Sequence, residues 1–271
     1  MTKFSSRQNR EFWDKDALDK KDNPKGTHSD PYLVDLEDKF VISCLKSVKP
    51  KQLLDIGCGN GQRTTRFSNF VSKSTYGIDY SSKMIQQANL LLSKLPSKTR
   101  KKIKFSTYDI QKFQSKNTKF DVIVSCRCFI NQTTFSNQVK LFKLLHSIMK
   151  KNGTLILAEG SFEGYNYLNS LRKKFGLKPI KIPWFNLPIK ESVVFPKIKK
   201  LFKISRINRL GIYYYLTRVL HPALVFPKNP NPNSKMNKLS MESENLFQQE
   251  KITNDFLDKC GAHLLVKFKK I

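Results

Sequence analysis

Three glycines at alternate positions, flanked by two aspartates, are the residues with the clearest chemical potential. The run LLDIGCGNG ends an apolar segment at Asp55 and then places Gly57, Gly59 and Gly61. Glycine lets the backbone turn tightly and approach a ligand closely, and a helix starting there presents unpaired N–H groups. Asp79 ends the next apolar segment, near the roughly 20-residue offset of a ribose-binding carboxylate. These residues predict a nucleotide-cofactor site.

Strands and helices alternate around this motif. Apolar and β-branched runs predict strands at 51–56, 74–79, 102–108, 120–126 and 154–158. Helical spacing and capping residues predict helices at 31–45, 61–71, 82–95 and 136–149. Alternation at this spacing indicates a parallel sheet covered on both faces, whose ligand sites lie at the carboxyl ends of the strands.

The segment after Gly160 carries a weaker pattern. It predicts a helix at 162–175, a proline-broken stretch at 178–188, closing strands at 202–210 and 262–269, an aromatic stretch at 211–226 and a loop at 227–249. The aromatic stretch is too short and too interrupted to cross a bilayer.

The glycine motif differs from other nucleotide motifs. Gln62 stands where the dinucleotide fingerprint requires glycine, and no phosphate-binding lysine motif is present. The chain resembles the class I S-adenosylmethionine-dependent methyltransferases over roughly residues 50 to 160. The matching motifs are the glycine-rich segment 55–61, the strand-two carboxylate Asp79, the pair Asp109-Ile110, the fourth-strand segment 120–125 and the turn 151–155.

This resemblance implies an α/β, Rossmann-like, doubly wound and mostly parallel seven-stranded sheet, with an N-terminal helical lid and a C-terminal insertion. We expect a lid or cap segment at 1–48 and the S-adenosylmethionine-binding core at 49–160. Residues 161–271 would then cover the acceptor and supply the closing strands of the same domain.

The resemblance also implies which side chains hold S-adenosyl-L-methionine. Asp79 can accept both ribose hydroxyls, Asp109 can accept from the adenine amine, and Arg127 can hold the methionine carboxylate. The expected cofactor-binding residues are Asp55, Gly57, Cys58, Gly59, Gly61, Asp79, Tyr80, Met84, Asp109, Ile110, Cys126 and Arg127.

The acceptor is expected to be a small molecule or glycan precursor methylated on oxygen. Methylation of a hydroxyl needs a base, and His28 and Glu159 are the candidates, whereas His146 and His263 are expected in core or surface positions. The tract 159–186 resembles bacterial small-molecule methyltransferases found with surface-polysaccharide genes, although an ordinary lid packed on the sheet would look similar. The expected substrate-binding residues are Trp13, Asn131, Asn169, Arg172, Trp184, Asn186 and Tyr213.

Absent motifs narrow the class of acceptor. No Asn-Pro-Pro-aromatic or Asp-Pro-Pro-aromatic run follows the fourth strand, which argues against amino-methylating DNA and protein enzymes. A Pro-Cys pair is also missing, which argues against cytosine-C5 enzymes. Cys126 and Cys128 lack neighbours at ligand spacing, so no metal is expected.

The chain has 271 residues, five cysteines and a net charge of +29, with 50 Lys and Arg against 21 Asp and Glu. An odd number of cysteines and a polar first segment, without a signal peptide, predict a cytoplasmic protein. The charge leaves open an RNA methyltransferase that uses a basic surface, although Lys far outnumbers Arg. Peripheral membrane contact through residues 197–218 and a cofactor-binding protein without turnover also remain open.

Overall fold

A seven-stranded sheet forms the centre of the computed structural model, which describes residues 5–20, 30–113 and 119–271. The strand order is β3-β2-β1-β4-β5-β7-β6. Neighbouring strands from β3 to β5 are parallel, and β7 runs antiparallel to both β5 and β6. The strands are β1 (Gln52–Ile56), β2 (Ser74–Asp79), β3 (Ile103–Thr107), β4 (Phe120–Cys126), β5 (Met149–Gly160), β6 (Phe202–Arg209) and β7 (His263–Lys270). The predicted α/β, Rossmann-like, mostly parallel sheet is confirmed.

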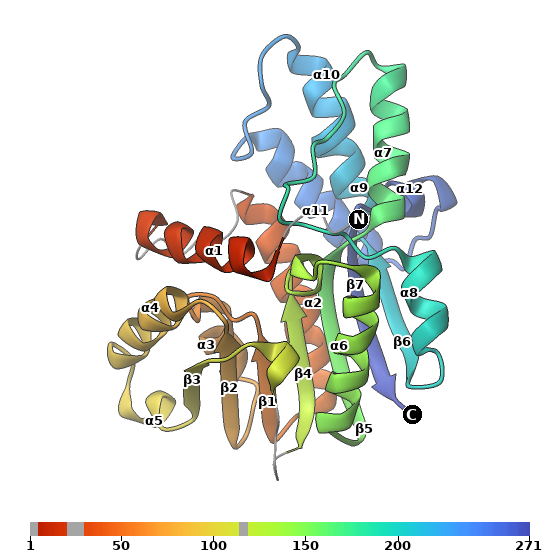
Figure 1. The fold of residues 1–271 in the computed structure, drawn as a ribbon. Coiled ribbons are helices and arrows are strands. Elements are labelled where there is room, and N and C mark those ends of the chain that lie inside the picture. The colour runs from red at the N-terminus through yellow and green to blue at the C-terminus, as the bar shows by residue number, and fades with distance from the viewer. Residues whose placement is uncertain (1–4, 21–29, 114–118) are drawn as a thin grey trace.

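Helices cover both faces of the sheet (Figure 1). The twelve α-helices among the described residues are α1 (Ser6–Lys20), α2 (Pro31–Val48), α3 (Gln62–Ser68), α4 (Ser82–Ser93), α5 (Ser97–Arg100), α6 (Phe135–Ile148), α7 (Phe162–Lys174), α8 (Glu191–Ile198), α9 (Gly211–Tyr215), α10 (His221–Val225), α11 (Lys235–Gln249) and α12 (Asp255–Cys260). Two 3₁₀ turns, η1 (Ile110–Lys112) and η2 (Phe129–Asn131), follow β3 and β4, and a π-helical stretch, η3 (Leu216–Leu220), joins α9 to α10.

Successive strand residues alternate between two cores. Leu53 and Val122 pack with α2 and α3 on one face, whereas Leu54 and Ile123 pack with α6 and α8 on the other. Side chains of a strand point to opposite faces in turn, so a strand covered on both faces is apolar throughout. The continuous apolar runs seen in the sequence are therefore the central strands.

Side-chain caps fix where the main helices begin. Asp30 Oδ1 accepts from the N–H of Leu33 at 3.2 Å to start α2, and Ser81 Oγ accepts from the N–H of Met84 at 3.1 Å to start α4. Each cap satisfies an N–H that the first helical turn leaves without a partner. The cap of α4 sets that helix directly after the end of β2.

The loop predicted at 227–249 is wrong over its second half, because residues 235–249 form α11. Ser234 caps this helix, and its buried positions include Asn237, Ser240 and Glu244. Leu239 and Leu246 of this helix are exposed, so its apolar residues do not mark the face that packs on the fold, and the polar composition of the segment indicated a loop. Glu244 accepts from the N–H of Tyr213, which ties α11 to α9.

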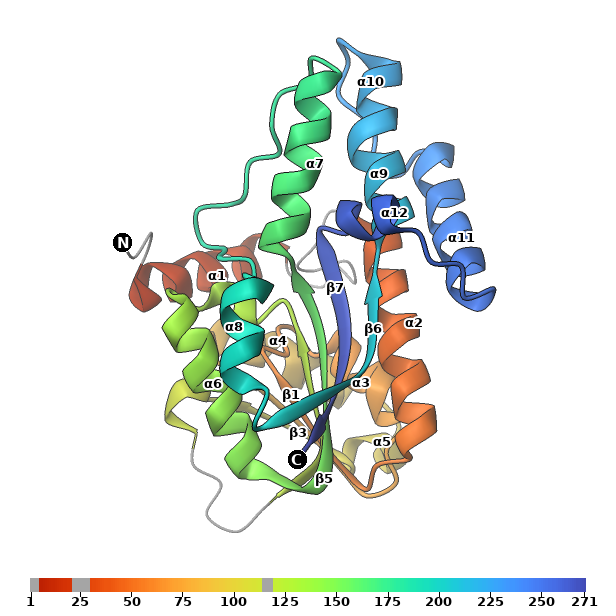
Figure 2. The same ribbon diagram turned by 90° about the vertical axis from the view of Figure 1, so that its right-hand side faces the viewer.

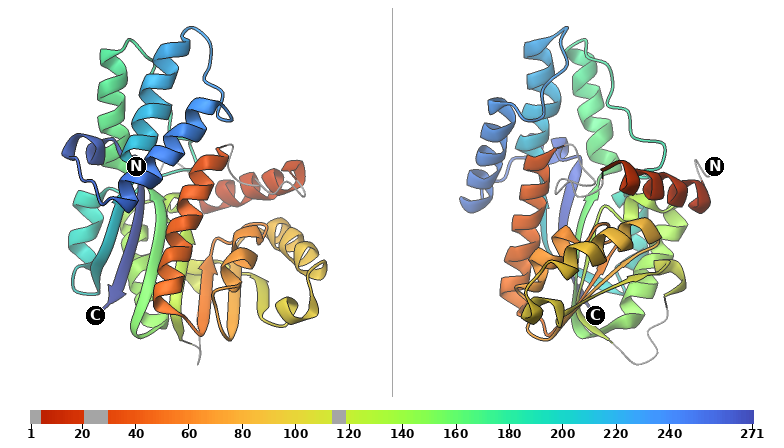
Figure 3. Two further views of the ribbon diagram at one scale, coloured as in Figure 1. Left: turned by 180° about the vertical axis from the view of Figure 1, so that it is seen from behind. Right: turned by 90° about the vertical axis from the view of Figure 1, so that its left-hand side faces the viewer.

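Two groups of helices lie at the carboxyl ends of the parallel strands. Helix α7 and the run α9–η3–α10 project beyond the sheet, and residues 175–190 return from the end of α7 to α8 as an extended strap (Figure 2). Helix α1 lies beside α4, across the same edge (Figure 3). Among the described helices, none is long and apolar enough to cross a membrane.

Candidate active site

The turn between β1 and α3 requires its glycines. Gly57, Gly59 and Gly61 have φ of 67°, 54° and 76°, in the left-handed region. A Cβ on Gly57 would lie 2.8 Å from Cys128 Cβ, and one on Gly61 would lie 2.6 Å from the ring of Phe105. The turn therefore keeps a conformation and a closeness of approach that other residues cannot reproduce.

Two carboxylates support this turn in different ways. Asp55 is buried and accepts from Thr64 Oγ1 at 2.5 Å, so it fixes the start of α3 behind the turn. Asp79 accepts from the N–H groups of Gly59 and Ser81, each at 2.9 Å, and borders a cavity. Burial raises the pKa of Asp55 to about 7 and that of Asp79 to about 6. The hydrogen bonds to both carboxylates lower the pKa, but the effect of burial is larger.

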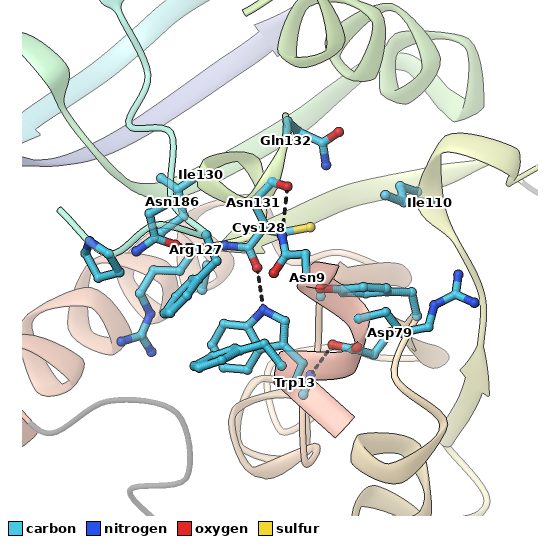
Figure 4. A pocket seen from close by; sticks show the side chains of 18 of the residues that line it. Asn9, Trp13, Asp79, Ile110, Arg127, Cys128, Ile130, Asn131, Gln132 and Asn186 are labelled. Atoms are coloured by element: carbon cyan, nitrogen blue, oxygen red, sulfur yellow. Dashed lines mark hydrogen bonds between the residues drawn. The ribbon is translucent and has the colours of Figure 1, made fainter. Parts of the chain in front are cut away.

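The cavity has a volume of about 420 Å³ and lies at the carboxyl ends of the parallel strands (Figure 4). Such a position at the end of an open α/β sheet is where ligands bind. The predicted cofactor residues that line it are Gly57, Gly59, Asp79, Tyr80, Met84, Asp109, Ile110, Cys126 and Arg127. Asp55, Cys58 and Gly61 do not line it, and Asp55 acts on the turn from behind. Burial keeps the pKa of the Cys126 and Cys128 thiols well above the ordinary value.

Arg127 reaches the cavity from the residue after β4. Its φ is 63°, and its N–H donates to Ala158 O at 2.9 Å. Its Nη2 lies 3.8 Å from Glu37 Oε2, while its buried Nη1 has no hydrogen-bond partner within the described ranges. A buried donor without a partner is costly unless a ligand satisfies it. Arg127 is therefore fitted to hold an anionic group.

His263, which the sequence placed in the core or on the surface, lines the cavity at the start of β7. Its Nε2 lies 2.8 Å from Glu37 Oε1, and the Oε2 of Glu37 is 2.6 Å from Arg63 Nη1. Burial would raise the pKa of Glu37, but Arg127, Arg63 and His263 together lower it well below its usual range. Glu37 is thus a buried carboxylate, and the ring of His263 lies beside it, although the 2.8 Å contact lacks the alignment of a hydrogen bond.

The cavity extends from β2 to β7. Tyr165, Tyr214 and His263 border the part beyond β5. The planes of Tyr214 and His263 are nearly parallel, with centroids 6.4 Å apart. This part of the cavity lies beyond the side chains predicted to hold the cofactor.

Glu159 does not face the cavity, which corrects its prediction as a base. It is fully buried, and its carboxylate accepts from Ser125 Oγ at 2.7 Å and from three N–H groups of residues 128–130 at 2.9 to 3.2 Å. Burial raises the pKa of Glu159 to about 7, although these hydrogen bonds lower it. Glu159 holds the loop after β4 in place. His28 lies outside the described residues.

Three of the predicted substrate residues lie away from the cavity and have structural partners. Asn169 bonds the backbone of Ile180, accepting from its N–H at 2.7 Å. Arg172 donates to the carbonyls of Lys178 and Arg218. Tyr213 is buried, and its hydroxyl donates to Asp30 at 2.6 Å. These side chains fasten the strap to α7, α7 to η3, and α9 to the start of α2.

Helix α1 and the strap close the cavity from opposite sides. Asn131 links them, since its Oδ1 accepts from Trp13 Nε1 at 2.8 Å and its Nδ2 donates to Asn186 at 3.0 Å (Figure 4). The rings of Phe12 and Phe185 stack with centroids 4.1 Å apart. The predicted residues Trp13, Asn131 and Asn186 line the cavity, whereas Trp184 contacts Phe12 outside it.

Metal ligands are not gathered at this site. Across residues 5–20, 30–113 and 119–271, no three His, Cys, Asp or Glu side chains come together as a metal-binding group.

The model of a methyltransferase domain family matches residues 47–185, which is half of the chain. The chain belongs to this methyltransferase domain family. It is 25% identical over 224 residues to the protein 235L of Invertebrate iridescent virus 6, which carries a methyltransferase name. The match covers 70% of this chain and 81% of that protein.

Solved structures share the fold at low sequence identity. Magnesium protoporphyrin IX methyltransferase from Synechocystis PCC 6803, with bound S-adenosylhomocysteine, has a TM-score of 0.62 and 14% identity, covering 98% of this chain and 100% of that one. The N-methyltransferase NodS from Bradyrhizobium japonicum WM9, in complex with S-adenosylhomocysteine, has a TM-score of 0.57 and 12% identity, covering 95% and 98%. The fold is that of class I S-adenosylmethionine-dependent methyltransferases, as predicted.

Proposed function

We propose that this chain transfers the methyl group of S-adenosyl-L-methionine to a hydroxyl oxygen of a small molecule or glycan precursor. The cofactor supplies an electrophilic methyl group on a sulfonium. Membership of the methyltransferase domain family and the fold support the reaction class. The observation that carries the finer assignment is His263 in the cavity wall, with its Nε2 2.8 Å from the buried carboxylate of Glu37.

The cavity residues fit the cofactor group by group. Each oxygen of Asp79 accepts one backbone N–H and retains a lone pair for a ribose hydroxyl. Asp109 and Ile110 offer a polar and an apolar contact to an adenine ring, and both line the cavity. Arg127 Nη1, a buried donor without a partner in the described part of the chain, is suited to the carboxylate.

His263 is the base that methylation of a hydroxyl requires. In this proposal the ring places an N–H at Nε2 toward Glu37 Oε1, 2.8 Å away, and a lone pair at Nδ1. Nδ1 can then take the proton of an acceptor hydroxyl as the oxygen attacks the methyl carbon. Positioned proton transfer of this kind contributes about 10²- to 10⁴-fold to a rate.

A covered cavity supports a small acceptor. Trp13, Asn131 and Asn186 join α1 to the strap across the opening, and Phe12 stacks on Phe185. Enclosure excludes water from the reacting groups and limits the size of the acceptor. A folded RNA helix would need these contacts to open.

The test combines cofactor binding with product formation. Calorimetry measures S-adenosylmethionine binding to the wild type, His263→Asn and the exposed-site control Asp255→Asn. Release of S-adenosylhomocysteine is then followed with sugar nucleotides, hydroxylated small molecules, amines and a single-stranded RNA. We expect turnover on a hydroxyl acceptor, retained cofactor affinity in all three proteins, and a loss of about 10²-fold or more in kcat for His263→Asn only.

Three results would count against the proposal. Turnover on amines or RNA alone would replace the acceptor class. Cofactor binding without turnover on any acceptor class would favour a binding protein. An unchanged kcat for His263→Asn would remove the base.

A further inference from the structure

The basic residues of this chain are concentrated in one segment. Between residues 164 and 241 there are sixteen Lys and Arg but a single acidic residue, Glu191. That carboxylate is engaged, since its Oε1 accepts from Arg209 Nη1 at 2.9 Å. The segment therefore presents positive charge without carboxylates of its own to neutralise it.

Part of this segment, α7 and the run α9–η3–α10, projects furthest from the sheet, whereas residues 191–209 contain α8 and the sheet strand β6. The C-terminal ends of α7 and α10 lie side by side at the far end of the projection (Figures 1 and 2). Arg172 near the end of α7 donates to the carbonyl of Arg218 in η3, and Arg218 pairs with Asp30 at 2.5 Å. These contacts join α7 to η3, which leads into α10, and join η3 to the start of α2, so the projection is anchored on the rest of the fold.

Apolar side chains are exposed at this end. Leu224 and Phe226, in the last turn and cap of α10, have 76% and 71% of their surface exposed, the largest values among the large apolar side chains of the described residues. Phe175, the cap of α7, is 48% exposed. Large apolar side chains gathered at an exposed end mark an interaction surface.

Lysines surround these apolar side chains in the sequence. Lys173, Lys174 and Lys178 flank Phe175, and Lys228 follows Phe226 by two residues; all four are exposed. Lysine next to exposed aromatic and aliphatic groups is typical of surfaces that enter the headgroup region of anionic lipid. RNA recognition instead favours arginine for paired and stacked contacts, but here Arg172 bonds carbonyls and Arg218 pairs with Asp30.

We propose that the end formed by Phe175, Leu224, Phe226 and the four lysines, here called the apolar-basic tip, docks the protein on an anionic lipid bilayer. The apolar side chains enter the boundary between headgroups and acyl chains, and the lysine ammonium groups stay at the level of the lipid phosphates. This surface differs from residues 197–218, which the sequence suggested. The strap starts at the tip and reaches the cavity wall at Pro183 and Phe185.

The test is vesicle co-sedimentation of the full chain, with phosphatidylcholine vesicles compared with vesicles that also contain phosphatidylglycerol. Leu224→Ser/Phe226→Ser removes the apolar part of the tip, and Lys174→Gln/Lys228→Gln removes charge. The matched controls are Leu90→Ser/Leu246→Ser, at leucines 53% and 54% exposed on α4 and α11, and Lys98→Gln/Lys101→Gln on and beside α5. Cofactor affinity and thermal unfolding report whether each variant is folded.

We expect the wild type to bind only the anionic vesicles, with a partition coefficient that falls as salt rises. The apolar tip variant should lose about tenfold or more, and the lysine variant about 25-fold, because each lysine near such a surface contributes about fivefold. Both control variants should bind as the wild type does.

Several outcomes would overturn the proposal. Equal losses in tip and control variants would indicate attraction by net charge alone, and equal binding to neutral vesicles would contradict the role of the lysines. Absence of pelleting with anionic vesicles would also overturn it. Binding of a fluorescent single-stranded RNA that depends on Lys174 and Lys228, without vesicle binding, would assign the surface to nucleic acid. None of these measurements depends on methyl transfer.

Discussion

Replacing Asp79 by alanine tests the cofactor site without knowledge of the acceptor. In the structure each carboxylate oxygen accepts one backbone N–H, from Gly59 or Ser81, and keeps a lone pair toward the cavity. A hydrogen bond to a charged group is worth about 1.5–3 kcal/mol. At the lower value of this range, the loss of hydrogen bonds to two ribose hydroxyls costs about 3 kcal/mol of binding free energy. The dissociation constant of S-adenosylhomocysteine should therefore rise about 150-fold.

Isothermal titration calorimetry measures this change directly. Asp79→Asn should fall between the wild type and alanine, because the amide retains one acceptor oxygen but turns an N–H₂ group toward a backbone donor. Asp255→Ala, at an exposed carboxylate of α12, should bind as the wild type does. A dissociation constant for Asp79→Ala within twofold of the wild type, in a protein that unfolds normally, would refute the assignment of Asp79 to the ribose.

The pH dependence of binding provides a second measurement at the same residue. Burial raises the pKa of Asp79 to about 6, and the carboxylate is the form that accepts two hydroxyl donors. Protonation below pH 6 competes with the ligand, so affinity should be level above that value and fall about tenfold per pH unit below it. Asp79→Asn carries no such proton, and its affinity should not show this decrease. The same decrease in Asp79→Asn would assign it to another group.

Three further substitutions probe the turn, the cover and the buried charge. Gly57→Ala should lower cofactor affinity and thermal stability, because the φ of Gly57 is 67° and a Cβ there would lie 2.8 Å from Cys128. An unchanged dissociation constant and an unchanged melting temperature would contradict this. Trp13→Ala loses the hydrogen bond to Asn131 and should speed release of S-adenosylhomocysteine roughly tenfold in stopped-flow measurements. An unaltered release rate would argue that α1 does not cover the cavity. Glu37→Gln should lower the melting temperature at neutral pH by about 10 °C. Because the fold lowers the pKa of Glu37, its stabilisation is present at neutral pH and lost as pH falls below the ordinary glutamate range, so the variant should lack that loss.

The sequence predicted the part of the fold in which local pattern and tertiary environment agree. The strands at 74–79 and 120–126 have the predicted bounds, since strands covered on both faces must be apolar throughout. The glycine turn was recognisable for a related reason. Its positive φ values and its closeness to Cys128 and Phe105 leave glycine as the only residue that fits.

The candidate base was not predictable, because the partners that define it are distant in sequence. His263 and Glu37 are joined only when β7 inserts between β5 and β6 and α2 packs across the sheet. His263 pairs with Gly160 in the register of β5 and β7, next to the pair formed by Glu159 and Leu264. Glu159 turns to the N–H groups of residues 128–130 instead, and only the conformation of that loop decides this.

The buried carboxylate of Glu37 connects the two ends of the cavity. Its Oε1 lies 2.8 Å from His263 Nε2, whereas its Oε2 lies 2.6 Å from Arg63 and 3.8 Å from Arg127. Arg63 remains beside Glu37 Oε2 when Arg127 turns to a ligand carboxylate, so Glu37 would not be left as a buried charge without a partner. Because Glu37 is on α2 and Arg63 is in the first turn of α3, the same contacts also hold the glycine turn against α2.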